Sequence, residues 1–379
     1  SGIQRIEAFY GNRKEEKHVY EVYRRLADIY FDTTKYEKAV AVYKLILGRW
    51  PYRPDNPDVQ DKVILALERQ RKFDEAIKER EEFTRLFGKG TEWEQRNRNN
   101  PSALKKARDY DEQALIQAAV HHHRAGQDLK KRGVAMSDTS LLQQASQEYA
   151  AAADAYRKYL ERFPRTKNSY EIRYSLAMCL FYSERFLEAA AVFAAVRDSN
   201  LDDRFREGAA FSTAKAYEEH IKQLQLKNQA EEPPLPTAKA PPPSLDPIAM
   251  PEAYRQWQKA LDDYARVLPQ SPKAPRLTYK AAELSYRFRH WDDARTRFAV
   301  IFEKHCKTEM AANAGQAILV TYQLQKNLDK MEEWATKMQS GTCVAGESAA
   351  KLIAGSKLLL EGIKFTRARS LHPRADQLL

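Results

Sequence analysis

Long apolar runs are missing from this chain and glycine is scarce. No run of about 18 apolar residues occurs, so nothing in the sequence is predicted to span a membrane. Only 13 of the 379 residues are glycine, whereas 30% are charged, which is typical of long solvated helices. The first residues, Ser1-Gly2-Ile3, contain neither a methionine nor the apolar core of a signal peptide. We interpret Ser1-Gly2 as a cloning scar and expect that a signal, an anchor or further repeats were trimmed away.

The motifs of common enzyme classes are also missing. The sequence has no phosphate-binding glycine loop, no nucleophile elbow, no His-Glu-x-x-His and no Cys-x-x-Cys. His121, His122 and His123 are adjacent in a predicted helix, where neighbouring side chains point about 100° apart and cannot converge on one metal. We therefore predict a non-enzyme with no catalytic residue, no metal, no cofactor and no small-molecule substrate. An enzyme would need a metal or cofactor, at this histidine run or elsewhere.

The charge balance is basic but not concentrated. The chain carries 63 Lys and Arg against 52 Asp and Glu, a net charge of +11. A nucleic-acid interface would gather that excess into a stripe or block. Instead the signs alternate, as at residues 74–82, which is typical of solvated helix faces. Nucleic acid is therefore disfavoured as a partner, and an acidic partner or anionic surface remains the alternative.

A helix–turn–helix pattern is present between residues 23 and 51. Apolar side chains recur at helical spacing on two segments that a turn at residues 32–34 separates, and a proline ends the second. These positions are Tyr23, Leu26, Ala27, Tyr30, Ala39, Tyr43, Ile46 and Pro51. One such hairpin cannot bury its apolar stripe alone, so further copies should pack beside it.

The spacing resembles the tetratricopeptide repeat, a helix–turn–helix unit of about 34 residues. The resemblance implies an all-α fold: a right-handed α-solenoid of about seven repeats with a C-terminal capping helix. In style the chain is loosely similar to bacterial cell-envelope tetratricopeptide proteins of outer-membrane assembly or gliding motility. That similarity implies a scaffold for protein partners or peptide segments, in the periplasm or associated with the envelope. A cytoplasmic location, and an intracellular regulatory or nucleic-acid-associated solenoid using a basic surface, are the alternatives.

The repeats divide the chain into successive segments. We predict an N-terminal helix at 1–18, as the end of a trimmed repeat, followed by repeats 1–2 at 19–88 and a loop at 89–108. Repeats 3–4 and the first helix of repeat 5 should lie at 109–226, and a proline-rich insertion at 227–251. The rest of repeat 5 and repeats 6–7 should then lie at 252–343, and a capping helix with a tail at 344–379. The prolines of the insertion exclude a helix there. We expect a solvated excursion between two helices, with a polyproline ligand for another domain as the alternative.

The family resemblance also implies a concave groove lined by the first helix of each repeat. Placing the groove positions of the family on this chain gives the protein-binding candidates Arg24, Asp28, Phe31, Tyr174, Met178, Phe181, Tyr182, Phe211, Lys215, Tyr279, Glu283, Tyr286 and Arg287. Aromatic and arginine side chains are common anchors at protein interfaces. The alternative is that several of these tyrosines pack between repeats.

Two of the three cysteines occupy equivalent places in neighbouring repeats. Cys306 and Cys343 each follow a second helix, and a disulfide would form if the loops bring their Cα atoms within about 7 Å. Such a bond would indicate an oxidising compartment such as a bacterial periplasm. The alternative is two unrelated thiols. Cys179 lies within a predicted first helix, where it should pack as a small apolar group.

Overall fold

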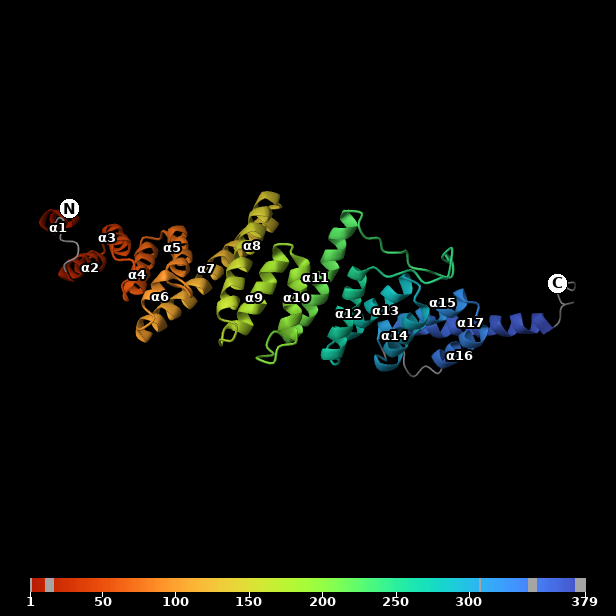
Figure 1. Cartoon of the computed structure of the whole chain (residues 1–379). Helices are drawn as coiled ribbons and strands as arrows, with labels where there is room; N and C mark the ends of the chain where they lie inside the picture. The colour runs from red at the N-terminus through yellow and green to blue at the C-terminus, as the bar shows by residue number, and fades with distance from the viewer. Residues whose placement is uncertain (1, 11–16, 307, 340–345, 372–379) are drawn as a thin grey trace. The chain divides into compact units, whose positions relative to one another are not determined.

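The structure is a computed structural model that describes residues 2–10, 17–306, 308–339 and 346–371 (Figure 1). Within these ranges every regular element is a helix. The chain divides into two units, Ser1–Arg185 and Phe186–Leu379. Each unit is a stack of helices, most of which pack mainly on their neighbours in sequence. This arrangement confirms the predicted all-α solenoid.

The first unit contains nine described helices. They are α1 (Gly2–Tyr10), α2 (Lys17–Asp32), α3 (Tyr36–Arg49), α4 (Asn56–Arg69), α5 (Phe73–Phe87), α6 (Glu92–Arg96), α7 (Pro101–Met136), α8 (Thr139–Arg162) and α9 (Ser169–Tyr182). The helices α4 and α7, which are the first helices of two consecutive hairpins, are also in contact. The first helix of one hairpin thus lies beside the first helix of the next.

The second unit contains eight described helices. They are α10 (Phe186–Arg197), α11 (Arg206–Leu226), α12 (Glu252–Val267), α13 (Ala274–Arg287), α14 (Trp291–Lys304), α15 (Glu309–Leu324), α16 (Leu328–Gln339) and α17 (Gly346–Leu371). First helices again meet, since α13 contacts α15. The last helix, α17, packs on α15 and α16, where Leu352 joins a cluster with Phe302 and Met338. It covers the apolar face of the last hairpin, as a capping helix should.

Within the described ranges, the same turn geometry recurs after seven helices. Each turn places one non-glycine residue at positive φ, between 52° and 62°. The seven residues are Thr34, Arg71, Ser137, Glu184, Asn228, Arg289 and Lys326. The next amide donates to the carbonyl five residues before it, as Lys35 does to Tyr30 at 2.8 Å, which is the Schellman ending of a helix. Each of these helices in the described ranges therefore ends in the same way.

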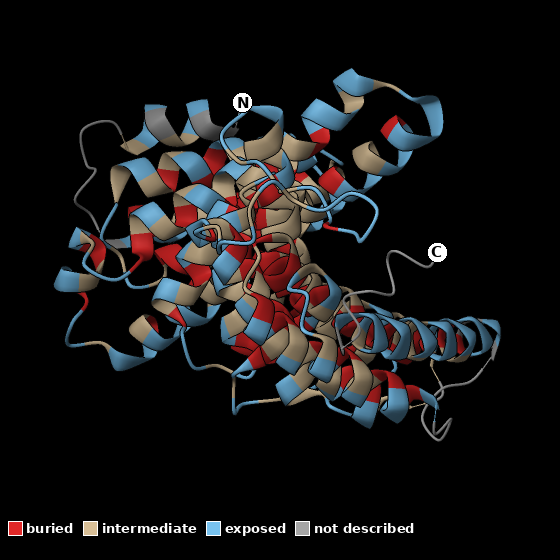
Figure 2. Ribbon diagram, turned by 90° about the vertical axis from the view of Figure 1, so that its right-hand side faces the viewer, coloured by how far each residue is buried: buried red, intermediate tan, exposed pale blue. Residues whose placement is uncertain are grey.

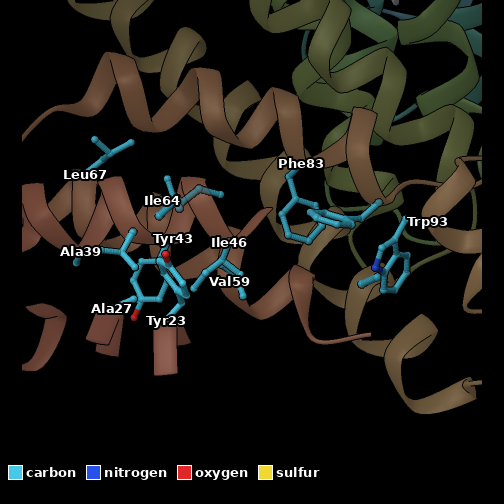
Figure 3. Packing of buried hydrophobic residues seen from close by; sticks show 14 of the residues in the cluster. Tyr23, Ala27, Ala39, Tyr43, Ile46, Val59, Ile64, Leu67, Phe83 and Trp93 are labelled. Atoms are coloured by element: carbon cyan, nitrogen blue, oxygen red, sulfur yellow. The ribbon is translucent and has the colours of Figure 1, made fainter. Parts of the chain in front are cut away.

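The apolar stripes predicted from residues 23–51 form the core of the first unit. Tyr23 and Ala27 on α2 meet Tyr43 and Ile46 on α3, and all four are buried (Figure 3). The cluster continues through α4 and α5 to Trp93, whose Nε1 donates to the Arg53 carbonyl at 2.7 Å. Figure 2 shows the general pattern, with buried residues on the sides of helices that face other helices and exposed residues on the outer sides.

The predicted loop at 89–108 is wrong over much of its length. Residues 92–96 form the short helix α6, and α7 begins at Pro101 and continues to Met136. The Asn100 side chain accepts a hydrogen bond from the Ala103 amide and caps α7, while Pro101 takes the first helical position. Asparagine followed by proline is thus a helix start here, because the proline nitrogen needs no acceptor at that position.

Candidate protein-binding groove

The groove candidates of the second unit meet around one pocket of about 830 Å³. Four predicted residues line it: Phe211 and Lys215 from α11, and Tyr279 and Glu283 from α13. The remaining lining residues are Ala214, Glu218, Trp257, Leu261, Lys273, Arg276, Leu277, Lys280 and Met310. Successive first helices α11, α13 and α15 therefore present one common face, as the repeat arrangement predicts.

The pocket combines an apolar floor with a charged rim. Trp257 and Leu261 of α12 are buried at its base. On the rim, Lys215 lies 2.8 Å from Glu218, and Lys280 lies 3.3 Å from Glu283. Apolar surface provides affinity, and a few charged groups fix the orientation of a bound segment.

One helical turn further along α13, the same face is covered by the proline-rich insertion. The hydroxyl of buried Tyr286 donates to the Pro236 carbonyl at 2.7 Å. Arg287 donates from Nη1 to the Pro233 carbonyl at 3.0 Å, and its Nε lies 3.0 Å from a Glu232 oxygen. Burial raises the pKa of Tyr286. These two predicted groove residues thus already bind a segment of their own chain.

The other end of the insertion is fixed to the turn between α13 and α14. The Ile248 amide donates to the Phe288 carbonyl at 2.9 Å, and the Ile248 carbonyl lies 2.7 Å from His290 Nε2. Trp291 Nε1 donates to the Leu245 carbonyl at 2.7 Å, and Met250 is buried in the core. Figure 1 shows the insertion as a long non-helical trace that leaves α11 and returns to α12.

Most residues of the insertion are exposed, as expected of a solvated excursion, but its two ends are bound to α13 and to the start of α14. Its prolines do prevent a helix, as predicted, but its main-chain carbonyls accept hydrogen bonds from Tyr286, Arg287 and Trp291. A proline-rich strand keeps its carbonyls free of internal hydrogen bonds, so donors on a neighbouring helix can bind them.

The first predicted group in the first unit is engaged by residues of its own hairpin and of the next one. Arg24 Nε lies 3.4 Å from Asp28 on the same helix, and the Tyr43 hydroxyl of α3 donates to Asp28 at 2.6 Å. Phe31 packs edge to face on Tyr36 with ring centroids 5.5 Å apart, and the Lys62 ammonium lies 4.3 Å from the Phe31 ring. These residues are half-buried, and they hold α2 against its neighbours.

The second predicted group of the first unit lies on α9, where all four side chains are half-buried. Tyr182 packs on Tyr149 of α8 with ring centroids 5.0 Å apart, and Lys130 of α7 lies 3.4 Å from its ring. Burial raises the pKa of Tyr174. Tyr182 therefore packs between repeats, as the alternative interpretation of the tyrosines expects.

Sequence reasoning missed an acidic set on α4. Asp58 accepts hydrogen bonds from Lys106 at 2.8 Å and from Tyr110 at 3.0 Å. Asp61 follows on the same face, and burial raises its pKa. Both aspartates lie at groove positions of the family on α4, the first helix of the hairpin that α5 completes. The signal was present in the sequence, but the family's groove positions were not carried over to this less typical unit.

The histidine run lies on α7 and its members have different surroundings. His122 Nδ1 lies 2.7 Å from Glu148, whereas His123 Nδ1 lies 3.2 Å from the Tyr156 hydroxyl. Burial lowers the pKa of His123. Among the described residues no group of three potential ligands could hold a metal ion.

Two predictions concern cysteines. Cys179 is fully buried on α9, as expected, and burial raises its pKa to about 12. Cys343 lies outside the described residues, so its pairing with Cys306 stays a prediction. Of the helices in the described ranges, none is both long and apolar enough to cross a bilayer.

Comparison with known proteins places a repeat family in the middle of the chain. Residues 138–203 match the family model described as Tetratricopeptide repeat. No curated protein matches the sequence. The matched stretch, which includes α8, α9 and α10, is therefore a tetratricopeptide-repeat segment, as the resemblance predicted.

Several solved structures are similar at low identity. The TPR domain of P58(IPK) is 11% identical, with 90% of this chain and 98% of that chain covered and a TM-score of 0.24. Yeast Tom70 is 12% identical, with coverages of 99% and 97% and a TM-score of 0.18. The Naa15/Naa10 complex bound to HypK-THB is 13% identical, with coverages of 94% and 64% and a TM-score of 0.16. Likenesses this distant say nothing about the partners of this chain.

Proposed function

We propose that this protein is a non-catalytic scaffold that binds segments of other proteins on the groove face of its second unit. The observation that carries the proposal is the pocket of about 830 Å³ formed by α11, α12, α13 and α15. It contains four side chains that the family resemblance had assigned to a groove. A tetratricopeptide-repeat segment lies at residues 138–203, and such repeats typically act as interaction modules.

The chemistry of the pocket supports a peptide rather than a small polar substrate. Phe211 is 37% exposed beside the buried Trp257, so an apolar side chain could be covered there. The pairs Lys215–Glu218 and Lys280–Glu283 offer both signs of charge within one rim. An extended segment with alternating apolar and charged side chains would contact both the apolar surface and the charged pairs.

The test is affinity capture from native cells with the double variant Phe211→Ala and Lys215→Ala. Its matched control is Leu187→Ala with Lys304→Ala, which removes exposed side chains outside the pocket. We expect specific partners to be lost from the pocket variant and kept by the control. Partners that both variants retain would refute the pocket as the binding site, and salt-sensitive capture of nucleic acid would favour the basic-surface alternative.

For the cellular setting we propose a bacterial cell-envelope or motility assembly, with the protein in the periplasm or associated with the envelope. The support is the similarity in style to envelope scaffolds and the predicted pairing of Cys306 with Cys343. Fractionation of native cells, followed by thiol labelling with and without reductant, tests both points. Recovery in the cytoplasm with both thiols free would refute this setting.

A further inference from the structure

The insertion contacts the groove through a short stretch at its beginning, residues 231–236, which we name the acidic–proline arm. Its sequence is Glu-Glu-Pro-Pro-Leu-Pro. Three of its groups are bound. The Glu232 carboxylate lies between Arg287 and Lys280, at 3.0 and 3.6 Å, and the carbonyls of Pro233 and Pro236 accept hydrogen bonds.

The groove recognises this arm mainly through features that another peptide would share. Two of the contacts are to main-chain carbonyls, which any extended peptide presents. The Pro236 ring is buried, whereas Leu235 points outward and is 45% exposed. The arm thus presents the Glu232 carboxylate, the carbonyl of the next residue, and the buried Pro236 three residues further on, in the sequence pattern Glu-Pro-x-x-Pro. Prolines lower the entropy cost of binding because they hold the strand extended before it docks.

The two ends of the insertion differ in how firmly they are held. Residues 245–250 form a backbone hydrogen bond with Phe288 and bury Met250 in the apolar core. The acidic–proline arm has no backbone-to-backbone hydrogen bond to the groove among the described contacts. Residues 237–244, which connect the two, are mostly exposed. The arm could thus leave the groove while the other end stays in place.

The arm also borders the open pocket. Lys280 lines the pocket, pairs with Glu283 at 3.3 Å and lies 3.6 Å from Glu232 of the arm. Tyr279 and Glu283 face the pocket, whereas Tyr286 and Arg287, one turn later, bind the arm. A single strand along α13 could therefore run from the pocket onto the surface that the arm covers.

We propose that the acidic–proline arm is an internal ligand of α13, and that partner proteins present an extended Glu-Pro-x-x-Pro segment that displaces it. The proposal rests on the proposed function only in placing partner binding on this face. It names the class of partner segment: acidic, proline-containing and extended. It also assigns the insertion a role, because the arm would keep this part of the groove closed until a competing segment arrives.

The tether sets the strength of the competition. An arm joined to α11 by a few residues acts at an effective concentration on the order of 1 mM. If a free peptide binds the empty site with a Kd on the order of 10 µM, the arm weakens its binding to the natural chain about 100-fold. Removing the arm should therefore reveal a site that is almost silent in the natural protein.

The experiment measures binding of a fluorescein-labelled peptide with the sequence of residues 229–240 by fluorescence anisotropy. Two full-length proteins are compared: the natural chain, and a released variant in which residues 231–236 are replaced by glycine and serine over the same length. We expect the released variant to bind at least tenfold more tightly. In the released variant, Tyr286→Phe and Arg287→Gln should each weaken binding several-fold, and added salt should weaken it further.

Two controls keep the result interpretable. A peptide in which the glutamate equivalent to Glu232 is glutamine should bind the released variant several-fold more weakly. If the released variant does not keep its helical circular dichroism, Glu232→Gln in the natural chain replaces it, and should raise the affinity for the unmodified peptide. Absence of peptide binding to a folded released variant, or equal affinity for both proteins, would overturn the proposal. Either result leaves the capture experiment with the Phe211 and Lys215 variant unaffected, so the two proposals can fail separately.

Discussion

The pair formed by Arg162 and Asp111 allows a stability prediction that the structure makes quantitative. Asp111 lies on α7 with a side chain 6% exposed, and Arg162 lies at the end of α8 with a side chain 23% exposed. Arg162 Nη1 donates to both Asp111 oxygens, at 2.8 and 3.1 Å, and the Thr84 hydroxyl of α5 donates to one of them at 2.6 Å. Three helices of the first unit therefore share one buried carboxylate.

Arg162→Met should destabilise the first unit by about 3 kcal/mol at pH 7. The change keeps the apolar stem but leaves the Asp111 charge buried without its cation, and such losses are about 3–5 kcal/mol. We choose the lower end because water reaches Arg162. Adding Asp111→Asn should restore much of the loss, because an amide is far easier to bury than an unpaired carboxylate.

The pH dependence of this variant has a definite sign. Burial raises the pKa of Asp111 even in the natural protein, although Thr84 and Arg162 act in the opposite direction. With a raised pKa the folded state binds the proton more tightly than the unfolded chain, so stability falls as pH rises through that pKa. Loss of Arg162 raises the pKa further, and the deficit of Arg162→Met should be smaller at pH 4.5 than at pH 7.

The assay is urea unfolding at both pH values, followed by circular dichroism and by hydrogen exchange of α7 and α8. Local exchange is needed because repeat arrays need not unfold in one step. Arg96→Met is the matched control, since it removes an exposed pair with Glu92 at 2.7 Å and should cost at most about 1 kcal/mol. If Arg162→Met costs no more than this control, or if Asp111→Asn gives no recovery, the reasoning is refuted.

Three further predictions concern single sites in the first unit. Thr34→Gly should raise the free energy of unfolding by about 1 kcal/mol, because a β-branched residue is strained at φ 59°; a loss in urea unfolding would contradict this. Cys179, buried and with its pKa raised to about 12, should resist iodoacetamide at pH 8 until urea unfolds the protein, and labelling of the native protein seen by mass spectrometry would count against it. Burial lowers the pKa of His123, so the free energy of unfolding should fall as pH drops below about 6.5. His123→Phe should reduce this fall in urea titrations from pH 7.5 to 5.5. An equal fall in the variant would show that other groups cause it.

The hairpins could be predicted because their signals are local. The stripe formed by Tyr23, Ala27 and Tyr43 needs only helical periodicity and a turn, and those side chains are buried as expected. The segment after Gly88 was harder because the same residue types can begin a helix or form a loop. Asn100 caps α7 only because the following chain packs as a helix against α5 and α8. Local composition does not contain that tertiary information.

The sequence predicted which side of the first helices forms the groove, but not which residues on that side form an open binding site. The groove positions of the family put Tyr279, Glu283, Tyr286 and Arg287 on one side of α13, and the structure has all four there. The sequence could not show which part of this side of α13 is open to a partner. The donors on Tyr286 and Arg287 bind main-chain carbonyls of the insertion, and a carbonyl is present at every residue. Contacts to main-chain carbonyls therefore cannot be predicted from the residue types of the insertion.

Lys280 shows why the open and the covered parts of this face should act together. Its ammonium is shared between Glu283, at 3.3 Å, and Glu232 of the acidic–proline arm, at 3.6 Å. A partner carboxylate that enters the pocket would compete with Glu232 for this cation. Each contact with the partner would then weaken a contact of the arm, so the arm need not be released before binding begins. Under this scheme Lys280→Met should weaken both partner capture and arm docking, whereas Lys215→Ala, which lines the pocket from α11 and pairs with Glu218, should weaken capture alone.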